Sequence, residues 1–413
     1  MKNFLNFFVL IILIFPINIF AQNINSYNIN ANLNSESKTL EINQIMKFKN
    51  TSDISLKEII LEDWSNSYVD NRTNLAKRIS DEYSRSFSFA KKKQRGSTKI
   101  KTINSVYIDS WRRSSNTSDI IEVHLNKSLK PGESIELEIN YTVKLPDSKF
   151  TGYGFDNDNF YLKNWLIVFS NISNSNWYSQ SNLNLDDQSL QKSGYKLKIS
   201  FDKDYYLFSN LIKNNTEVIN NLKSVSLSGS GIKDVRINLL IEENYKRFQN
   251  NKNEIETDIF KSSSLEDAEI KVDRVNNFVK DYFNDNSNIK LLVPKIDYDS
   301  NPFYGLNQLP SFISPFSDEF LEEIIFLKSF VINYLNHIIN LDISNNNLGY
   351  QGIIALIGGL EKNTGIKILN ISSNNIGIEG GVTVSRLLDN NNMIVSLNVA
   401  SNQLEDIGAA HIL

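Results

Sequence analysis

The chain has 413 residues, with 43 Lys and Arg against 47 Asp and Glu, so its net charge of −4 lacks the positive excess of a nucleic-acid-binding protein. Hydrophobic residues make up 41%, which is enough to fill the cores of two or three domains. Cysteine is absent, which excludes disulfides, thiolate zinc sites and a cysteine nucleophile.

The N-terminus has the residue order of a secretory signal peptide. Lys2 precedes an apolar run over residues 4–15, and a short tail ends at Ala21, after which we expect cleavage. The alternative is a membrane anchor, but a run of about 12 residues is too short for about 30 Å of hydrocarbon. No later segment is long and apolar enough to span a membrane. We therefore expect a secreted, periplasmic or cell-envelope protein with no membrane span after signal cleavage.

Residues 22–245 predict one strand after another. Apolar and polar residues alternate over 40–48, 135–145 and 195–201, as in strands with one buried face. Pro131-Gly132 and Pro146-Asp147 supply turns at the ends of the second run. Short strands in series predict an antiparallel β-sandwich. We expect its four tryptophans to be buried: Trp64, Trp111, Trp165 and Trp177.

Residues 246–335 predict a short α/β segment that stops early. Helical spacing runs from Ala268 to Phe283, a short apolar strand covers 289–293, and a Pro-punctuated loop covers 302–315. Ser317 can cap a second helix over 318–335. The apolar residues that we expect on its inward side are Phe320, Ile324, Leu327, Phe330 and Val331.

From about residue 336 the sequence repeats itself. The segment LDISNNNL at 341–348 returns as LNISSNNI at 369–376 and as LNVASNQL at 397–404, a step of 28 residues each time. This pattern resembles the leucine-rich repeat of the long, ribonuclease-inhibitor-like type, in which each unit is a strand, an Asn turn and a helix. The array is short, so the helix at 318–335 is a candidate for its N-terminal cap.

The resemblance implies roles for the repeated positions. Asn346, Asn374 and Asn402 are expected to form an interior hydrogen-bonded ladder. Gly352, Gly380 and Gly408 are expected to allow the turn into each helix at positive φ. In such arrays the concave strand face binds partners, and its polar residues here would be Asn340, Asp342, Ser344, Asn370, Ser372 and Asn398. A protein partner could bind this face, although it carries no Trp, Tyr or Arg hot spot.

The first two-thirds of the chain carry a second resemblance. YNINANL at 27–33, MKFKN at 46–50, LKPGES at 129–134 and INYTVKLP at 139–146 resemble the N-terminal β-domain of the aminopeptidase-N-like zinc peptidases, the gluzincins. GYGFDND at 152–158 and NPFYGLNQLP at 301–310 are similar to exported bacterial members. The resemblance covers roughly residues 25–335.

The chemistry of that family needs an HExxH helix, whose two His bind zinc and whose Glu activates water. This chain has three His, namely His124, His337 and His411, and none has a second His at the required spacing. The exopeptidase loop of the family is matched only by Gly305-Leu-Asn-Gln, without its Glu. We therefore predict no catalytic residue, no metal ligand and no cofactor.

Other motifs have weaker functional interpretations. Asp156 and Asp158 begin like a calcium loop, but Phe160 breaks the ligand pattern and a polar turn is favoured. Gly229 and Gly231 favour a turn between strands over a dinucleotide loop. The basic run 91–95 favours a solvated loop, with contact to an anionic surface as the alternative. A Ser-His-Asp triad is disfavoured because no Gly-x-Ser-x-Gly elbow is present.

The predicted architecture is therefore a signal peptide at 1–21, a β-sandwich at 22–245, a partial catalytic-type α/β segment at 246–335 and leucine-rich repeats at 336–413. The predicted function is non-catalytic: an exported protein with a repeat module for protein interaction. The alternative is a truncated or inactive aminopeptidase-like zinc peptidase. A chimaeric gene model, joined near residues 330–340, is a third hypothesis.

Overall fold

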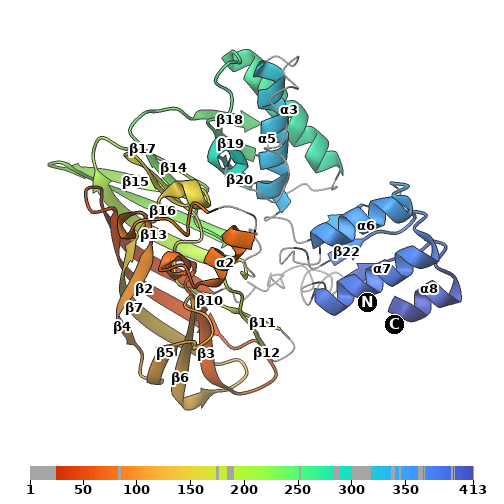
Figure 1. Cartoon of the computed structure of the whole chain (residues 1–413), viewed down its shortest axis with the longest axis horizontal. Coiled ribbons are helices and arrows are strands. Elements are labelled where there is room, and N and C mark those ends of the chain that lie inside the picture. Colours follow the sequence, from red (N-terminus) through yellow and green to blue (C-terminus); the bar gives the residue numbers. More distant parts are fainter. Residues whose placement is uncertain are drawn as a thin grey trace, which may run out of the picture.

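The computed structural model describes residues 25–412 apart from 82–84, 174–175, 184–189, 251–252, 283–288, 300–317, 336–339, 344–345, 361–365, 367, 392–393 and 395. The predicted signal peptide, the 301–310 motif, Ser317, His337 and Ser344 lie outside the described residues. In Figure 1 the first part of the chain is rich in strands, a helical layer on a small sheet follows, and strands alternate with helices at the C-terminal end.

The largest sheet has seven strands in the order β15-β16-β13-β1-β2-β7-β4. Its strands alternate between buried and exposed residues, as their period-two sequence predicts. The sheet is not wholly antiparallel, because β1 and β13 run parallel, which the sequence reasoning did not foresee. The strands are β1 (Ser26–Asn34), β2 (Thr39–Lys49), β4 (Ser97–Asn104), β7 (Ser134–Lys144), β13 (Ser193–Asp202), β15 (Ile212–Ile219) and β16 (Leu222–Ile232).

A second sheet, in the order β10-β3-β6-β5, shares its hydrophobic core with the first. Ile59 and Val123 of this sheet belong to the same buried cluster as Leu137 and Ile199 of the larger one. This part of the chain is therefore built of sheets around one apolar interior. The strands are β3 (Leu56–Glu62), β5 (Ile108–Arg113), β6 (Ile120–Leu129) and β10 (Val168–Phe169).

Short strands and helices complete the β-rich part. One four-stranded sheet has the order β14-β17-β9-β8, and β11 pairs with β12. The strands are β8 (Gly154–Asp156), β9 (Asn159–Leu162), β11 (Asn171–Ser173), β12 (Asn176–Tyr178), β14 (Tyr206–Ser209) and β17 (Ile237–Leu240). The helices are η1 (Trp64–Tyr68), α2 (Asn74–Asp81), η2 (Lys92–Gln94) and η3 (Ser148–Phe150).

Two predictions about this part were wrong. Trp64 and Trp165 are buried and Trp177 packs partly buried against the core, but Trp111 is exposed because it lies on the edge strand β5. Gly229 and Gly231 do not form a turn between strands, since both lie within β16. The positive φ of Gly231, 72°, accompanies a register shift in the pairing of β13 with β16.

Residues 246–335 form a three-stranded sheet, β18-β19-β20, covered by helices. Its elements are β18 (Lys246–Asn250), β19 (Asn253–Thr257), α3 (Leu265–Tyr282), β20 (Ile289–Val293), α4 (Lys295–Asp299) and α5 (Asp318–Leu335). The buried residues of α3 recur at helical spacing, as predicted: Ala268, Val272, Val275 and Val279.

The helix at 318–335 forms as predicted, and of its predicted apolar residues Phe330 is buried while Leu327 and Val331 pack partly buried against the core. Phe326, Phe330 and Tyr334 are fully buried and form a line of ring contacts that continues from Phe260. Phe320, expected to face inward, is exposed. The helix is apolar on more than one side, so its sequence alone leaves the inward face undecided.

The C-terminal part consists of strand–helix units. Strands β21 (Asn340–Asp342), β22 (Ile368–Asn370) and β23 (Ser396–Asn398) form a parallel sheet, and they alternate with α6 (Gly349–Leu360), α7 (Gly377–Asn390) and α8 (Glu405–Ile412). Buried residues of these units belong to one cluster with Phe326, Phe330 and Tyr334 of α5. The role of α5 as an N-terminal cap of the repeats stays a prediction. Over the described residues, no helix has the length and hydropathy that a membrane span requires.

Candidate functional site

The three repeat strands align without a register shift. Asp342 is paired with Asn370, and Asn370 is paired with Asn398, so that one residue from each repeat strand stands at the same register position. Asn340 begins the neighbouring row. We call the predicted polar residues of these strands and their ends the repeat-strand face: Asn340, Asp342, Asn370, Ser372 and Asn398, with Ser344 outside the described residues.

The amides of this face also support the backbone. The Asn370 Oδ1 accepts hydrogen bonds from the Ser372 N–H at 3.1 Å and from its hydroxyl at 2.8 Å. The Asn398 Oδ1 accepts from the Ala400 N–H at 3.1 Å. Asn370 and Ser372 are half-buried, whereas Asn398 and Ala400 are exposed. Between the second and third repeats, the more accessible part of the face is therefore in the third.

The ladder asparagines join successive repeats. Asn374 and Asn402 are at most 1% exposed, whereas Asn346 is exposed in the first unit. The Asn374 Nδ2 donates to the carbonyls of Ile343 at 2.9 Å and Ile371 at 3.0 Å. Its Oδ1 accepts from the Asn346 N–H at 3.0 Å, and the Asn402 Oδ1 accepts from the Asn374 N–H at 2.7 Å. Each amide thus satisfies backbone groups of two repeats, which is a structural role.

The explanation predicted for the repeated glycines was wrong. Gly352, Gly380 and Gly408 lie inside helices, and the positive φ values occur earlier, at Gly349 and Gly377. A Cβ on Gly380 would lie 2.6 Å from the Ile376 Cβ. Similarly, a Cβ on Gly352 would lie 2.9 Å from the Leu348 Cβ, and a Cβ on Gly408 would lie 3.2 Å from the Ile378 Cα. These glycines are therefore explained by the lack of space for a side chain.

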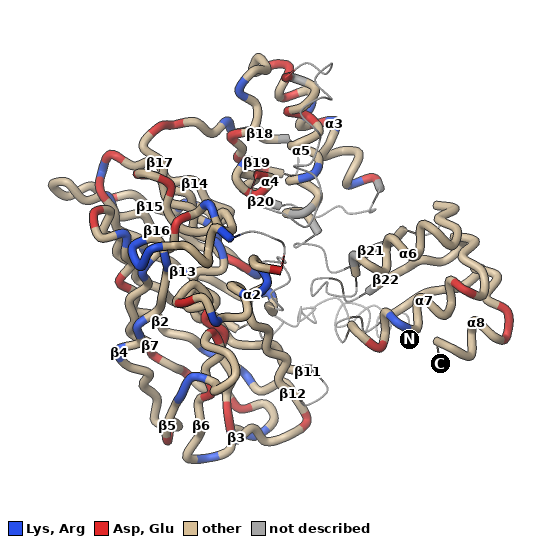
Figure 2. The backbone as a smooth tube through the Cα atoms, in the orientation of Figure 1, with Lys and Arg blue, Asp and Glu red and all other residues tan. Residues whose placement is uncertain are grey.

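Charge in the repeats is mostly negative. Residues 336–413 contain six acidic residues, Asp342, Glu361, Glu379, Asp389, Glu405 and Asp406, against three basic ones, Lys362, Lys367 and Arg386. Figure 2 shows this as red sections along the tube through α7 and α8 with little blue. A partner with a basic surface would be attracted to this end of the molecule.

The two histidines that the structure describes lie on different elements. His124 lies on β6, with its Nδ1 3.8 Å from the Glu58 Oε2, and His411 is exposed on α8. Within the described ranges there is no group of three or more His, Cys, Asp or Glu that could hold a metal ion. His337 lies outside them.

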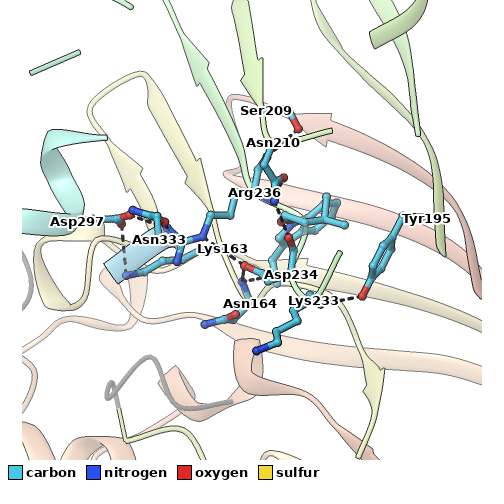
Figure 3. A network of polar contacts seen from close by, with 12 residues as sticks. Lys163, Asn164, Tyr195, Ser209, Asn210, Lys233, Asp234, Arg236, Asp297 and Asn333 are labelled. Atoms are coloured by element: carbon cyan, nitrogen blue, oxygen red, sulfur yellow. Dashed lines mark hydrogen bonds and ion pairs between the residues drawn. The ribbon is translucent and has the colours of Figure 1, made fainter. Parts of the chain in front are cut away.

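A polar network that the sequence reasoning missed lies between the β-rich part and residues 246–335 (Figure 3). The Arg236 Nη1 donates to the Asp297 Oδ2 of α4 at 2.6 Å and to the Asn333 Oδ1 of α5 at 2.8 Å. The Lys163 Nζ lies 3.7 Å from the Asp297 Oδ1, and the Arg236 Nε lies 3.7 Å from the Asp234 Oδ2. One guanidinium, from the residue before β17, thus links the β-rich part to α4 and α5.

The charges in this network stabilise each other. Burial alone opposes ionisation of Asp297, but the positive charges of Arg236 and Lys163 outweigh it and lower the pKa of this carboxyl. Asp234 accepts the Asn164 N–H at 3.1 Å, and Asn210 fixes the backbone next to Arg236, accepting its N–H at 2.9 Å. The arrangement contains no nucleophile and base in contact, so its chemistry is that of a structural ion-pair network.

Sequence comparison identifies the C-terminal part. The model for the Leucine Rich repeat matches residues 334–356, 362–385 and 390–413. The chain therefore ends in leucine-rich repeats, at the same 28-residue step as the sequence pattern. None of the curated proteins matches the chain.

Solved structures resemble about two-thirds of the chain. The M1 zinc metallopeptidase from Deinococcus radiodurans aligns at 10% identity and a TM-score of 0.42, covering 66% of this chain and 55% of that one. A two-domain M1 zinc metallopeptidase mutant bound to L-tryptophan aligns at 11% identity and a TM-score of 0.40, covering 66% and 57%. The alignment thus spans little more than half of these metallopeptidases.

Proposed function

We propose that this is an exported, non-catalytic protein that binds a partner protein through its leucine-rich repeats. The observation that carries the proposal is the register of the repeat strands, which brings Asp342, Asn370 and Asn398 into one row. Leucine-rich repeats commonly bind proteins through this face, and polar side chains here suit a partner with hydrogen-bonding and basic groups. Residues 22–245 would act as a β-sandwich scaffold, and the Arg236–Asp297 network would hold the following segment to it.

Site-specific cross-linking tests the proposal. A photoreactive residue at position 398 of the full chain, on the repeat-strand face, should form cross-links to one partner protein in envelope extracts. The control is the same residue at position 350, because Tyr350 is exposed on the helical side of the repeats, in α6. A cross-link from both positions, or from neither, contradicts a partner site on the strand face. Added salt should weaken the cross-link from position 398, since the repeats carry a net negative charge.

The alternative is a truncated or inactive aminopeptidase-like zinc peptidase, which the motifs of residues 25–335 favour. Metal analysis of the purified chain, together with aminoacyl-arylamide substrates, distinguishes the two functions. Stoichiometric zinc with turnover would overturn the non-catalytic proposal. Sequencing native transcripts across residues 330–340 tests the third hypothesis, that of a chimaeric gene model.

A further inference from the structure

The strongest local excess of positive charge lies in residues 85–101. This stretch contains seven Lys and Arg and no Asp or Glu, in a chain whose net charge is −4. Its centre is the run Lys91-Lys92-Lys93, and all three residues are exposed. None of the ion pairs found among the described residues involves these three lysines. We call residues 85–95 the basic corner.

The basic corner is a defined structure and not a loose loop. Lys91 begins η2, where the Gln94 N–H donates to the Lys91 carbonyl at 2.9 Å and the Lys91 N–H donates to the Gln94 Oε1 at 3.0 Å. The Asp147 N–H donates to the Gln94 carbonyl at 2.9 Å, and the Lys144 Nζ donates to the Lys92 carbonyl at 2.6 Å. Hydrogen bonds therefore fix the backbone of Lys91, Lys92 and Lys93 to the C-terminal end of β7. Their side chains project from an ordered turn.

Among the described residues, the carboxylate in contact with this turn is that of Asp147, and it is already paired. The Asp147 carboxylate accepts from the Gln94 Nε2 at 3.2 Å and pairs with the Lys149 Nζ at 3.2 Å. Partial burial, together with the nearby charge of Lys92, lowers the pKa of Lys144. Positive charges are thus crowded here, which raises the local electrostatic potential.

An aromatic side chain projects beside these charges. Phe87 is fully buried, with its ring 4.9 Å from that of Phe150 and the Arg95 guanidinium 5.4 Å from its centroid. Phe89, two residues further on, is 77% exposed. The Phe89 N–H donates to the Arg85 carbonyl at 3.2 Å, so the turn that buries Phe87 directs Phe89 outward next to Lys91. A single exposed hydrophobic side chain is ordinary on a protein surface, so Phe89 carries meaning here only because it projects from the same ordered turn as three exposed lysines.

We propose that the basic corner is a docking surface for an anionic lipid bilayer, in which Phe89 enters the headgroup region while Lys91, Lys92 and Lys93 contact lipid phosphates. A lipid surface supplies both the negative charge and the apolar layer that these side chains require. A single-stranded nucleic acid would satisfy the lysines, but its recognition relies on several aromatic side chains along a basic groove. Here one exposed phenylalanine stands beside a compact group of charges, which favours lipid.

Vesicle sedimentation of the full mature chain tests this docking surface. The probes are vesicles of phosphatidylcholine with about 30 mol% phosphatidylglycerol, and vesicles of phosphatidylcholine alone. We expect binding to the anionic vesicles only, and a large loss of binding between about 0.1 M and about 0.5 M NaCl. Replacing Lys91, Lys92 and Lys93 together by Gln should reduce partitioning by about 100-fold.

Matched variants distinguish binding by the basic corner from an effect of the protein's net charge. Lys57, Lys127 and Lys130 are exposed lysines near the start of β3 and the end of β6, so replacing all three by Gln gives the same change in net charge. This control should bind as the wild type does, and equal loss in both triple variants would overturn the proposal. Thermal unfolding of each variant identifies a loss of binding that comes from misfolding.

Phe89→Ser separates lipid from other polyanions. It should weaken binding to anionic vesicles several-fold while leaving retention on heparin unchanged. Absence of wild-type vesicle binding, or an unchanged vesicle affinity in Phe89→Ser, would refute the lipid assignment. Tight binding to single-stranded RNA without vesicle binding would identify the corner as a nucleic-acid site instead.

Discussion

Replacing Glu322 with glutamine tests how α5 is attached to the segment that precedes α3. The Glu322 Oε1 accepts the Lys261 N–H at 2.7 Å and the Ser262 N–H at 2.6 Å. Its Oε2 accepts the Ser263 N–H at 3.1 Å and the Ser263 hydroxyl at 2.8 Å. A buried carboxylate therefore satisfies three consecutive backbone donors from one position on α5.

The expected loss follows from these contacts. An amide keeps one acceptor oxygen, so Glu322→Gln retains the bonds of one oxygen and places an NH₂ group against the Ser263 N–H. The Ser263 hydroxyl already accepts from the Lys271 Nζ at 2.9 Å, and its second lone pair can accept from the new NH₂ group. Two hydrogen bonds to a charged group are lost at roughly 1.5–3 kcal/mol each, about 3–6 kcal/mol together, and the new bond returns about 1 kcal/mol, so we expect a destabilisation of about 2–5 kcal/mol.

The neighbouring residue supplies a matched control. Glu323 pairs with the Arg274 Nη1 at 2.9 Å, but the Arg274 side chain is largely exposed. Glu323→Gln makes the same chemical change in an exposed ion pair and should cost about 0.5 kcal/mol or less.

Urea unfolding, followed by helical circular dichroism, measures both variants in the full chain. Burial opposes ionisation of Glu322, but its hydrogen bonds with Ser262 and the adjacent residues outweigh burial and lower its pKa. Stability from such a group is present above the pKa of the unfolded chain and is lost as the pH falls through the folded pKa. The difference between wild type and Glu322→Gln should therefore shrink below about pH 4. Equal destabilisation by the two variants would refute the reasoning.

Three further predictions concern other parts of the molecule. Asp297→Asn leaves Arg236 and Lys163 without their shared carboxylate, so it should lower the free energy of unfolding by about 3–5 kcal/mol. It should also make the segment 246–335 sensitive to limited proteolysis, and unchanged protease resistance would contradict the role of this network. Gly380→Ala places a Cβ 2.6 Å from the Ile376 Cβ and should lower stability by about 1–3 kcal/mol in thermal unfolding. Its control is Gly358→Ala, which has no atom within 4 Å of the new Cβ and should stabilise α6 by about 0.5–1 kcal/mol. Burial raises the pKa of Asp119 to about 6 from 3.8, so its contribution to stability is greatest below the unfolded pKa and is lost as the pH rises through about 6. Wild type should therefore lose about 3 kcal/mol relative to Asp119→Asn between about pH 4 and about pH 7, and parallel pH profiles would disprove this shift.

The polar network and the aromatic line of α5 together describe how the parts of this chain are joined. Arg236 connects the β-rich part to α4 and α5, and Phe330 and Tyr334 of α5 belong to the cluster that continues into the repeats. The helix at 318–335 therefore has a polar contact with the β-rich part, and its buried rings belong to the hydrophobic cluster that also includes residues of the repeats.

Periodic features were determined by the sequence itself. The alternation in β2 and β7 predicts their buried faces, because successive side chains of a strand point to opposite sides. The 28-residue step predicts three equivalent strand–helix units, since each unit repeats the same local interactions. The turn at Pro131-Gly132, where Gly132 has a φ of 79°, is likewise a local property of those residues.

Features that depend on distant contacts were decided only by the tertiary structure. Whether Trp111 is buried depends on its strand lying at a sheet edge, and the inward face of α5 depends on Phe260, which lies far from it in sequence. Gly380 is needed because of the position of the Ile376 side chain, and not because of its own φ. The charges of Arg236 and Asp297 are 61 residues apart, and no periodic pattern relates them. Local periodicity is encoded in neighbouring residues, whereas these contacts arise only when separate elements pack together.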